Sequence, residues 1–361
     1  MDFRILDTDY RDVDVLEVFK SIIWTDRYWA HGDFELVLYP TIENLSYLME
    51  DYYLWSKDST HLMIIEDIQI KTDVEAGNEL IVTGRSLESL LDRRIVWQQT
   101  ILSGNFQEGI KKLIDDSIIT PSDSSRIIPN FIFEYSTDPA ITELTIEHQI
   151  TGRGLYEVIS TLCSERNIGF KVVLSSDNKF VFSMYAGEDR SYNQFKNPYV
   201  IFSPDFDNLI NSNYFSSKRG LKTIALVAGE GEGLARTTIE VLKENGGGIG
   251  LNRRELYVDA RDISSNNGQV SQNDYLELLR QRGINYLAEN ITIKAFEGNA
   301  ANFHMYVFNK DFYMGDVVQI ANEYNIESTS RVVEIVRSQN EEGVNFYPTF
   351  LTIPEIYPDS T

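Results

Sequence analysis

Apolar and polar positions alternate in the C-terminal part of the chain as they do in β-strands. Within residues 311–351, Val333 and Ile335 fall on one face of an extended segment, and the polar tetrad 340–343 separates it from a second apolar run. Gly315-Asp316 is a turn signal with apolar runs on both sides. The pattern predicts the closing hairpin of a small β-barrel.

Residues 64–84 show the same pattern near the other end of the chain. Glu66 or Asp67 falls opposite Glu334, Ile68 opposite Ile335, and Gly77 opposite Gly343. The spacing to the glycine differs by one residue, which a bulge or a longer turn absorbs. Two similar hairpins indicate a duplicated barrel. The alternative is chance likeness, because acidic and glycine-containing turns between β-branched runs are common.

The N-terminal region reads as strands followed by short helices, and we predict a first β-barrel domain over residues 1–97. The expected strands are 3–6, 13–24, 34–39, 62–70 and 80–82, with a short helix at 42–49. A further short helix is expected after Ser86 as its N-cap.

Helices and strands alternate from about residue 98, which predicts an α+β middle domain over 98–203 plus 251–290. Asn105 is placed to cap a helix, and residues 154–166 form a second amphipathic pattern that contains Cys163 as a core residue. Asp177-Asn178 suits a tight hairpin between strands 170–174 and 180–185.

The second β-barrel domain is predicted over residues 204–250 plus 291–361. Its expected strands include 209–215, 222–228, 237–242 and 291–296, and a helix over 272–289 interrupts it in sequence. The predicted fold class is therefore mixed β and α+β: two similar antiparallel β-barrels with an inserted α+β layer.

Composition limits the classes of function. The 361 residues carry a formal net charge of −23, which disfavours a basic nucleic-acid-binding face and binding to an anionic membrane. The single cysteine excludes an internal disulfide. No targeting segment and no run of about 20 apolar residues is visible, so we expect no membrane span and folding in a reducing cytoplasm.

Catalytic, cofactor and metal sites find little support in the sequence, and we predict none. The histidines, His31, His61, His148 and His304, lack metal-ligand spacing. The glycine-rich run 229–233 lacks the lysine of a phosphate-binding loop and is better explained as a hairpin tip. The carboxylates of 204–208 lack the glycine and terminal glutamate of a calcium loop. A glycosidase needs a pair of acids, and no pair stands out.

Several motifs together resemble one family. They are Asp311-Phe-Tyr-Met-Gly-Asp-Val-Val318, Val333-Glu-Ile335, Pro348-Thr-Phe350, Gly32-Asp-Phe-Glu-Leu36, the run from Gly84-Arg-Ser-Leu87 to Arg93-Arg-Ile-Val96, and Val227-Ala-Gly-Glu-Gly-Glu-Gly233. With these motifs the chain resembles siphophage tail-hub or tail-tip proteins, the Siphovirus ReqiPepy6-like baseplate hub family, over nearly its whole length. Met314 stands where that family more often has leucine.

The resemblance implies a structural hub at the tip of a phage tail. Such hubs are trimers in which each chain contributes two similar barrels, so that three chains make a pseudo-hexameric ring. The implied partners are a distal tail or tail tube ring, a tape-measure protein, and receptor-binding, fibre or lytic components, in a virion tail assembled in the host cytoplasm. The acidic residues would then line a channel that DNA passes without sticking, or simply cover a solvated surface.

Interface residues follow from the same reasoning. Trp29, Phe34, Phe312 and Tyr313 are candidate interface aromatics, with core packing as the alternative for each, and Gly32, Gly77, Gly315, Asp316 and Gly343 are expected turn residues. Two other functions stay open: a carbohydrate-active or peptidoglycan-degrading tail enzyme, and a receptor-binding module.

Overall fold

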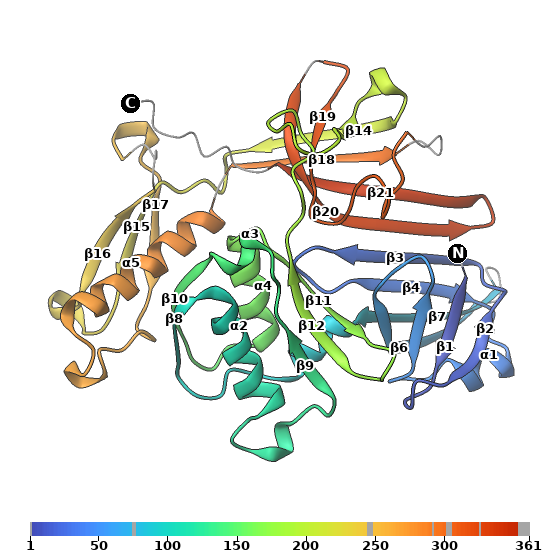
Figure 1. The fold of residues 1–361 in the computed structure, drawn as a ribbon, viewed down its shortest axis with the longest axis horizontal. Helices are drawn as coiled ribbons and strands as arrows, with labels where there is room; N and C mark the ends of the chain where they lie inside the picture. Colours follow the sequence, from blue (N-terminus) through green and yellow to red (C-terminus); the bar gives the residue numbers. More distant parts are fainter. Residues whose placement is uncertain are drawn as a thin grey trace.

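The structure is a computed structural model that describes residues 2–73, 77–243, 248–290, 292–300, 305–324 and 326–352. It is a mixed α/β, sheet-rich molecule whose largest sheet runs through the N-terminal and C-terminal parts of the chain (Figure 1).

The first 86 residues form mostly strands, as predicted. Their apolar residues alternate with polar ones, so one face of the curled sheet packs on a core around Phe3, Trp24 and Phe34. The elements are β1 (Phe3–Leu6), β2 (Asp12–Leu16), β3 (Ser21–Arg27), β4 (Asp33–Leu38), α1 (Ile42–Tyr47), β5 (Tyr53–Ser56), β6 (Leu62–Asp73) and β7 (Gly77–Ser86).

A middle region of helices on short sheets follows. Asn105 caps α2, because its side chain accepts the backbone N–H groups of Gln107 and Glu108. Cys163 is buried in α4. The elements are η1 (Leu87–Arg93), β8 (Thr100–Asn105), α2 (Phe106–Ile114), η2 (Asp115–Ile119), η3 (Ser124–Arg126), β9 (Phe131–Glu134), α3 (Pro139–Thr142), β10 (Thr145–Ile150), α4 (Leu155–Glu165), β11 (Gly169–Leu174) and β12 (Phe180–Tyr185).

The C-terminal strands return to the large sheet and bury a core around Phe202, Phe312 and Phe350. The elements are β13 (Ile201–Phe202), η4 (Pro204–Phe206), β14 (Leu209–Ser217), β18 (Ile293–Ala300), β19 (Val317–Ala321), β20 (Glu327–Asn340) and β21 (Gly343–Thr352). Of the predicted strand 291–296, residue 291 lies outside the described residues.

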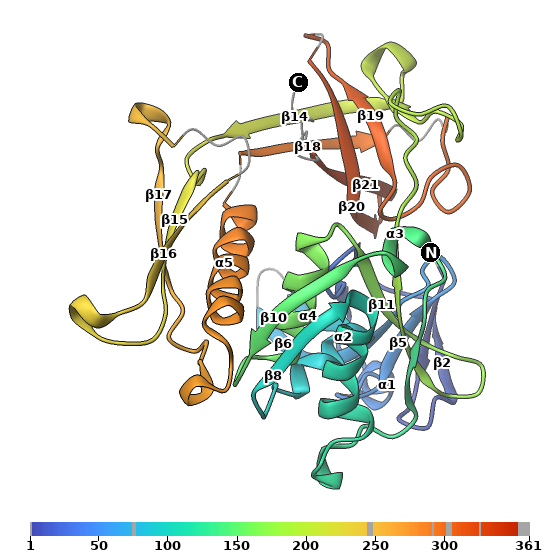
Figure 2. The ribbon, with the colours of Figure 1, turned by 60° about the vertical axis from the view of Figure 1, so that its left-hand side comes forward.

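A separate small unit is inserted between β14 and β18. Three strands in the order β16-β15-β17 are covered by α5, and they share a core with it (Figure 2). Its elements are β15 (Ile224–Ala228), η5 (Gly233–Ala235), β16 (Thr238–Leu242), η6 (Gly250–Asn252), β17 (Glu255–Asp259), η7 (Asn266–Gly268) and α5 (Gln272–Glu289). The predicted three-domain division stays a prediction, but β15 pairs with β16 on one side and with β17 on the other rather than with the C-terminal strands.

One sheet of thirteen strands joins the two ends of the chain. Its main path runs β14-β18-β21-β20-β3-β4-β7-β6-β5-β1-β2. Over the described residues this path has two ends and does not close, so the two predicted barrels are seen here as two halves of an open sheet. The reason is that β20 pairs with β3, which fuses the halves edge to edge.

The two predicted hairpins match residue by residue. In β6 a bulge falls between Ile65 and Asp67, and in β20 a bulge falls between Val332 and Glu334. From the bulge the ladders proceed in step: Asp67 faces Thr83 and Glu334 faces Thr349. Both ladders end at a glycine that opens the second strand, after a turn one residue longer in the first hairpin. The one-residue offset in the sequence is thus a turn-length difference.

The flanking strands continue the match, and we call the two sets repeat A (β3, β4, β7, β6, β5, β1) and repeat B (β14, β18, β21, β20, β19, β13). Phe34 of β4 faces Gly84, and Phe296 of β18 faces Phe350 at the equivalent position. Trp24 of β3 and Tyr214 of β14 are equivalent one strand further out. The repeats differ at β13, which runs parallel to β19 whereas β1 runs antiparallel to β5.

Of the remaining local predictions, one is confirmed and one is partly wrong. The hairpin of β11 and β12 is confirmed, with Asn178 at a φ of 58° in its turn. The expected helix after Ser86 is a 3-10 helix, and Ser86 does not cap it because its hydroxyl instead accepts the backbone N–H of Gly32 at 2.7 Å. No helix among the described residues has the length and apolar character needed to cross a membrane.

Candidate functional site

The two repeats meet where β3 pairs with β20, and we call this pairing the internal joint. It is antiparallel over seven residue pairs, from Glu334 opposite Arg27 to Asn340 opposite Ser21. The joint therefore brings together segments from opposite ends of the chain, which no local sequence pattern specifies.

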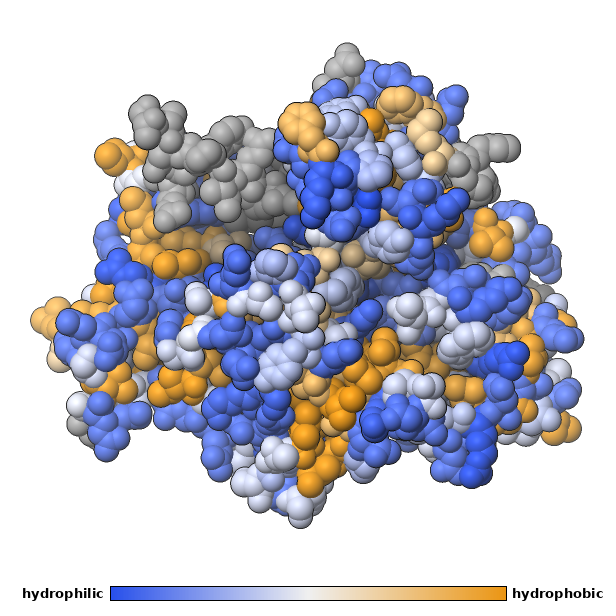
Figure 3. All heavy atoms as spheres, viewed as in Figure 1, coloured by the Kyte–Doolittle hydropathy of each residue, from blue (hydrophilic) through white to orange (hydrophobic). Residues whose placement is uncertain are grey.

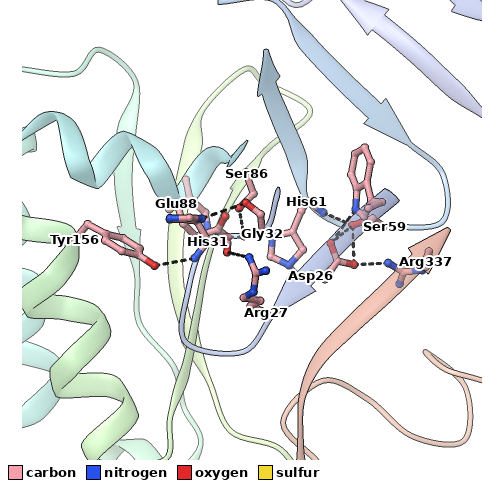
Figure 4. Close-up of polar contacts among 12 residues, drawn as sticks. Asp26, Arg27, His31, Gly32, Ser59, His61, Ser86, Glu88, Tyr156 and Arg337 are labelled. Atoms are coloured by element: carbon pink, nitrogen blue, oxygen red, sulfur yellow. Dashed lines mark hydrogen bonds and ion pairs between the residues drawn. The ribbon is translucent and has the colours of Figure 1, made fainter. Parts of the chain in front are cut away.

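A buried ion pair lies in the middle of the internal joint (Figure 4). Arg337 of β20 donates to Asp26 of β3 at 2.6 Å, and both side chains are buried. Asp26 also accepts from the indole N–H of Trp24 at 2.9 Å and from the hydroxyl of Ser59 at 3.0 Å. Burial alone raises the pKa of Asp26, but His61 and Arg337 outweigh burial and bring it below its usual value. The carboxylate stays ionised because charged and polar partners replace water.

His61 and Glu88 extend this polar cluster toward the middle region. Nδ1 of His61 lies 3.0 Å from Oε1 of Glu88, and the same oxygen accepts the backbone N–H of Val172 in β11 at 2.8 Å. Burial lowers the pKa of His61, but the carboxylates of Glu88 and Asp26 outweigh it and raise the pKa to about 9. His61 is thus a cation at neutral pH, enclosed between two anions.

Arg27 links strands of both repeats at one end of the internal joint. It donates to Glu334 across the joint at 2.7 Å and to Asp33 of β4 at 2.5 Å. Nearby, the backbone N–H of His31 donates to the hydroxyl of Tyr156 in α4 at 3.2 Å. Strands of both repeats and a helix of the middle region are therefore linked within one small volume (Figure 4).

The burial and pairing of these side chains indicate a structural role for the cluster. Asp26, His61 and Glu88 are all buried, so a substrate has no route to them. Asp26 and Oε1 of Glu88 face cations and hydrogen-bond donors, as charges in a structural network do, whereas Oε2 of Glu88 has no hydrogen-bond partner among the described residues.

A cleft on the middle region is a further feature with polar lining, and a smaller pocket lined by residues of α4 and α5 is another. The cleft has a volume of about 260 Å³ between the segment 96–101 and helix α2. Asp116 is the one carboxylate in its lining, and it pairs with Lys112 at 2.6 Å. Hydrolysis of a glycosidic bond requires two carboxyl groups, which this cleft does not supply.

The four predicted interface aromatics lie in different environments. Phe34 and Phe312 are buried in the cores of the two halves, and Trp29 is partly buried against the core of the middle region. Tyr313 is 43 % exposed. As candidates for partner contacts these residues remain predictions, and in the single chain Phe34 and Phe312 take the alternative role of core packing.

The predicted turn residues have separate structural roles. Gly77, Gly315 and Gly343 have positive φ values of 85°, 90° and 139°. Gly32 does not, and it is required by close approach, since a Cβ there would lie 2.3 Å from the carbonyl oxygen of Thr25. Asp316 is buried and accepts from Arg190 at 2.6 Å.

The other sequence features are dispersed. Besides His61, the described histidines are His31, which packs on Tyr156, and His148, whose pKa burial lowers to about 4; His304 lies outside the described residues. The run 229–233 lies in the loop between β15 and β16, as expected for a hairpin tip. Within the described ranges no group of three or more acidic, histidine or cysteine side chains is arranged to hold a metal.

The molecular surface is mostly hydrophilic on the face shown in Figure 3, with separate hydrophobic patches at the left and in the lower centre.

Sequence reasoning missed the cluster of Asp26, His61, Glu88 and Arg337. Its members are far apart in the chain: Asp26, His61 and Glu88 meet through the folding of the N-terminal part, and the pairing of β3 with β20 adds Arg337.

Comparison with protein families finds one match that spans nearly the whole chain. The family described as Siphovirus ReqiPepy6 Gp37-like protein matches residues 2–350. Comparison with curated protein sequences gives no match.

Solved structures of phage tail proteins share the fold at low sequence identity. The 43 kDa tail protein of prophage MuSo2 from Shewanella oneidensis has a TM-score of 0.58 and 11 % identity, with 98 % of each chain covered. The tail protein from Neisseria meningitidis MC58 has a TM-score of 0.55 and 11 % identity, covering 97 % of this chain and 95 % of the other. Prophage tail protein gp18 from Listeria monocytogenes EGD-e has a TM-score of 0.52 and 14 % identity, covering 98 % and 95 %.

Proposed function

The chain belongs to the Siphovirus ReqiPepy6 Gp37-like protein family, and from this premise we propose that it is the structural hub of a phage tail tip or baseplate. In this role three copies form a pseudo-hexameric ring that closes the tail tube. The ring joins a distal tail or tail tube ring on one side to host-binding or lytic components on the other, with the tape-measure protein as a further neighbour.

The observation that carries the proposal is the repeat inside one chain. Repeats A and B match strand for strand in their hairpins and in the strands beside them, including the position of a bulge. A chain with two equivalent wall segments lets three copies present six similar surfaces to a six-fold tube. We propose that each half of the large sheet is one such segment, with the inserted unit of β15–β17 and α5 and the middle region outside the wall.

The acidic composition suits a channel for DNA. With 55 acidic and 32 basic residues, each chain has a formal net charge of −23, which opposes the phosphate neutralisation that makes proteins hold DNA. DNA would pass the ring without specific binding as the genome leaves the particle.

An enzyme of the tail is the second candidate, and the cleft beside α2 gives it little support. The cleft beside α2 offers one carboxylate, already paired with a lysine, where a glycoside hydrolase requires two. The assignment as a structural protein does not depend on any catalytic residue.

The proposal is tested by the mass of the purified assembly and by the location of the chain in the phage particle. Native mass spectrometry of the purified chain is expected to give a species of three times 41.5 kDa. An epitope inserted at exposed Gly220, detected by gold-labelled antibody on assembled particles, is expected at the distal end of the tail. A monomer that releases fragments from purified peptidoglycan would favour the enzyme instead.

A further inference from the structure

Two strand edges of the large sheet have no neighbouring strand among the described residues, although their equivalents in the other repeat do. In repeat B, residues 334–340 of β20 pair with β3. The equivalent stretch of repeat A, residues 67–73 of β6, pairs only with β7. In repeat A, β3 has β20 on its outer side, whereas the equivalent strand β14 ends the sheet path.

These two edges correspond to the two sides of the internal joint and are therefore complementary to each other. The edge of β6 is equivalent to the β20 side of the internal joint, and the edge of β14 is equivalent to the β3 side. In the single chain they do not pair, and seven steps along the sheet path separate them. A second copy of the chain can bring them together by repeating the internal joint between molecules.

We propose that β14 of one copy pairs antiparallel with residues 67–73 of β6 in the next copy, in the register of the internal joint. This inference rests on the proposed hub function and specifies its subunit interface. The strand equivalences give seven opposed pairs: Asp67 with Ser217, Ile68 with Ser216, Gln69 with Phe215, Ile70 with Tyr214, Lys71 with Asn213, Thr72 with Ser212, and Asp73 with Asn211.

Residues on the two unpaired edges are more exposed to solvent than their equivalents in the internal joint, as expected where a neighbouring strand is missing. Ile70 is 53 % exposed, whereas its equivalent in the internal joint, Arg337, is 6 % exposed. Phe215 is 54 % exposed, whereas its equivalent Thr25 is 4 % exposed. Exposed edge strands that carry apolar side chains are sites where another chain pairs.

The charges are compatible with the proposed register. None of the seven pairs sets like charges opposite each other, which would oppose pairing. The buried ion pair of the internal joint has no counterpart, because Asp26 is replaced by Ser216 and Arg337 by Ile70. The joint between copies is thus held by backbone hydrogen bonds and by apolar contact of Ile70 with Tyr214, with little dependence on salt.

Because each copy uses two different edges, the contact is head to tail. Such contacts close into a ring when the rotation per copy divides a full turn, and they otherwise extend as filaments. The second copy, rather than an unrelated strand, is the occupant because its edge already has the required register and bulge.

Disulfide trapping tests the register directly in the full-length chain. Opposed residues in antiparallel strands have Cα atoms about 4.5–5.5 Å apart, which a disulfide can span. The double variant Gln69→Cys with Phe215→Cys is therefore expected to oxidise into a covalent three-chain species on non-reducing gels. The native Cys163 is buried and serves no such link.

A matched control places the second cysteine two residues out of register. In Gln69→Cys with Ser217→Cys, the Cα atoms would be roughly 8 Å apart, beyond the reach of a disulfide, and monomers are expected after oxidation. Both variants replace residues that are not buried, and thermal melting checks that each is folded.

The outcomes separate the interface from the hub function. A trimer by native mass without linkage of the 69 and 215 cysteines, or with equal linkage of the control, overturns the strand pairing and leaves the hub standing. A ladder of linked species that continues past three chains supports the pairing and contradicts the closed ring. A monomer at all concentrations, unlinked in both variants, overturns both.

Discussion

Asp26 and Arg337 show how single residues hold the two halves of the sheet together. A charge buried without its partner is far more costly than an exposed one, because water cannot reach it. Replacement of Arg337 by alanine is expected to destabilise the fold by about 3–5 kcal/mol in urea unfolding, since Asp26 would keep a buried charge.

The matched control for this prediction is an exposed arginine on another strand. Arg4 pairs with Asp12 at 3.0 Å at the surface, and Arg4→Ala is expected to cost less than about 1 kcal/mol. Equal losses in the two variants would show that the buried pair does not stabilise the joint.

His61 makes the stability of the same cluster depend on pH. Its pKa is about 9 in the folded chain and about 6.5 when unfolded, so its contribution is complete below pH 6.5 and is lost as the pH rises through 9. Between pH 6.5 and 10 the wild type is expected to lose about 3 kcal/mol more unfolding free energy than His61→Gln.

His31→Gln is the control for the titration of His61. The ring of His31 is partly buried, and burial lowers its pKa, so it stays neutral over the same range. A wild type and a His61→Gln variant with parallel pH profiles would contradict the assignment of a charged His61.

Gly32 sets the geometry of the connection from β3 to β4. The two strands can approach only because no Cβ points at the carbonyl of Thr25. Gly32→Ala is expected to lower the unfolding free energy by about 2–3 kcal/mol. Gly220→Ala, where a Cβ would meet nothing within 4 Å, is expected to change it by less than about 0.5 kcal/mol, and a similar loss in both would refute the steric account.

At the scale of elements, the sequence predicted what local periodicity specifies. The hairpin of β6 and β7, the capped helix α2 and the long helix α5 all follow from residues close together in the chain. The short strands β8, β9, β10 and β17 were not predicted individually, although β1 and β12, of similar length, were.

The grouping of elements was harder to predict than their existence. Both β15 and β16 read as strands, but nothing in their own residues indicates that β17 pairs with β15 across the 26 residues 229–254. The polar cluster of the joint was missed for the same reason, since Asp26 and Arg337 are 311 positions apart.

At the scale of the whole molecule, the repeat is the feature that connects sequence, fold and function. The match of Ile68 with Ile335 and of Gly77 with Gly343, visible in the sequence, is a match of ladder register in the structure. The chain has the five-residue connection 28–32 in repeat A and the inserted unit at the equivalent place in repeat B, so the two halves differ outside the common strands.

A cryo-electron microscopy reconstruction of the purified protein, calculated without imposed symmetry, tests the central claim most directly. The account predicts a closed ring of three chains in which repeats A and B alternate at equal radius, about 60° apart, with β14 of each chain beside β6 of the next. A ring of another copy number, or repeats at different radii, would contradict it.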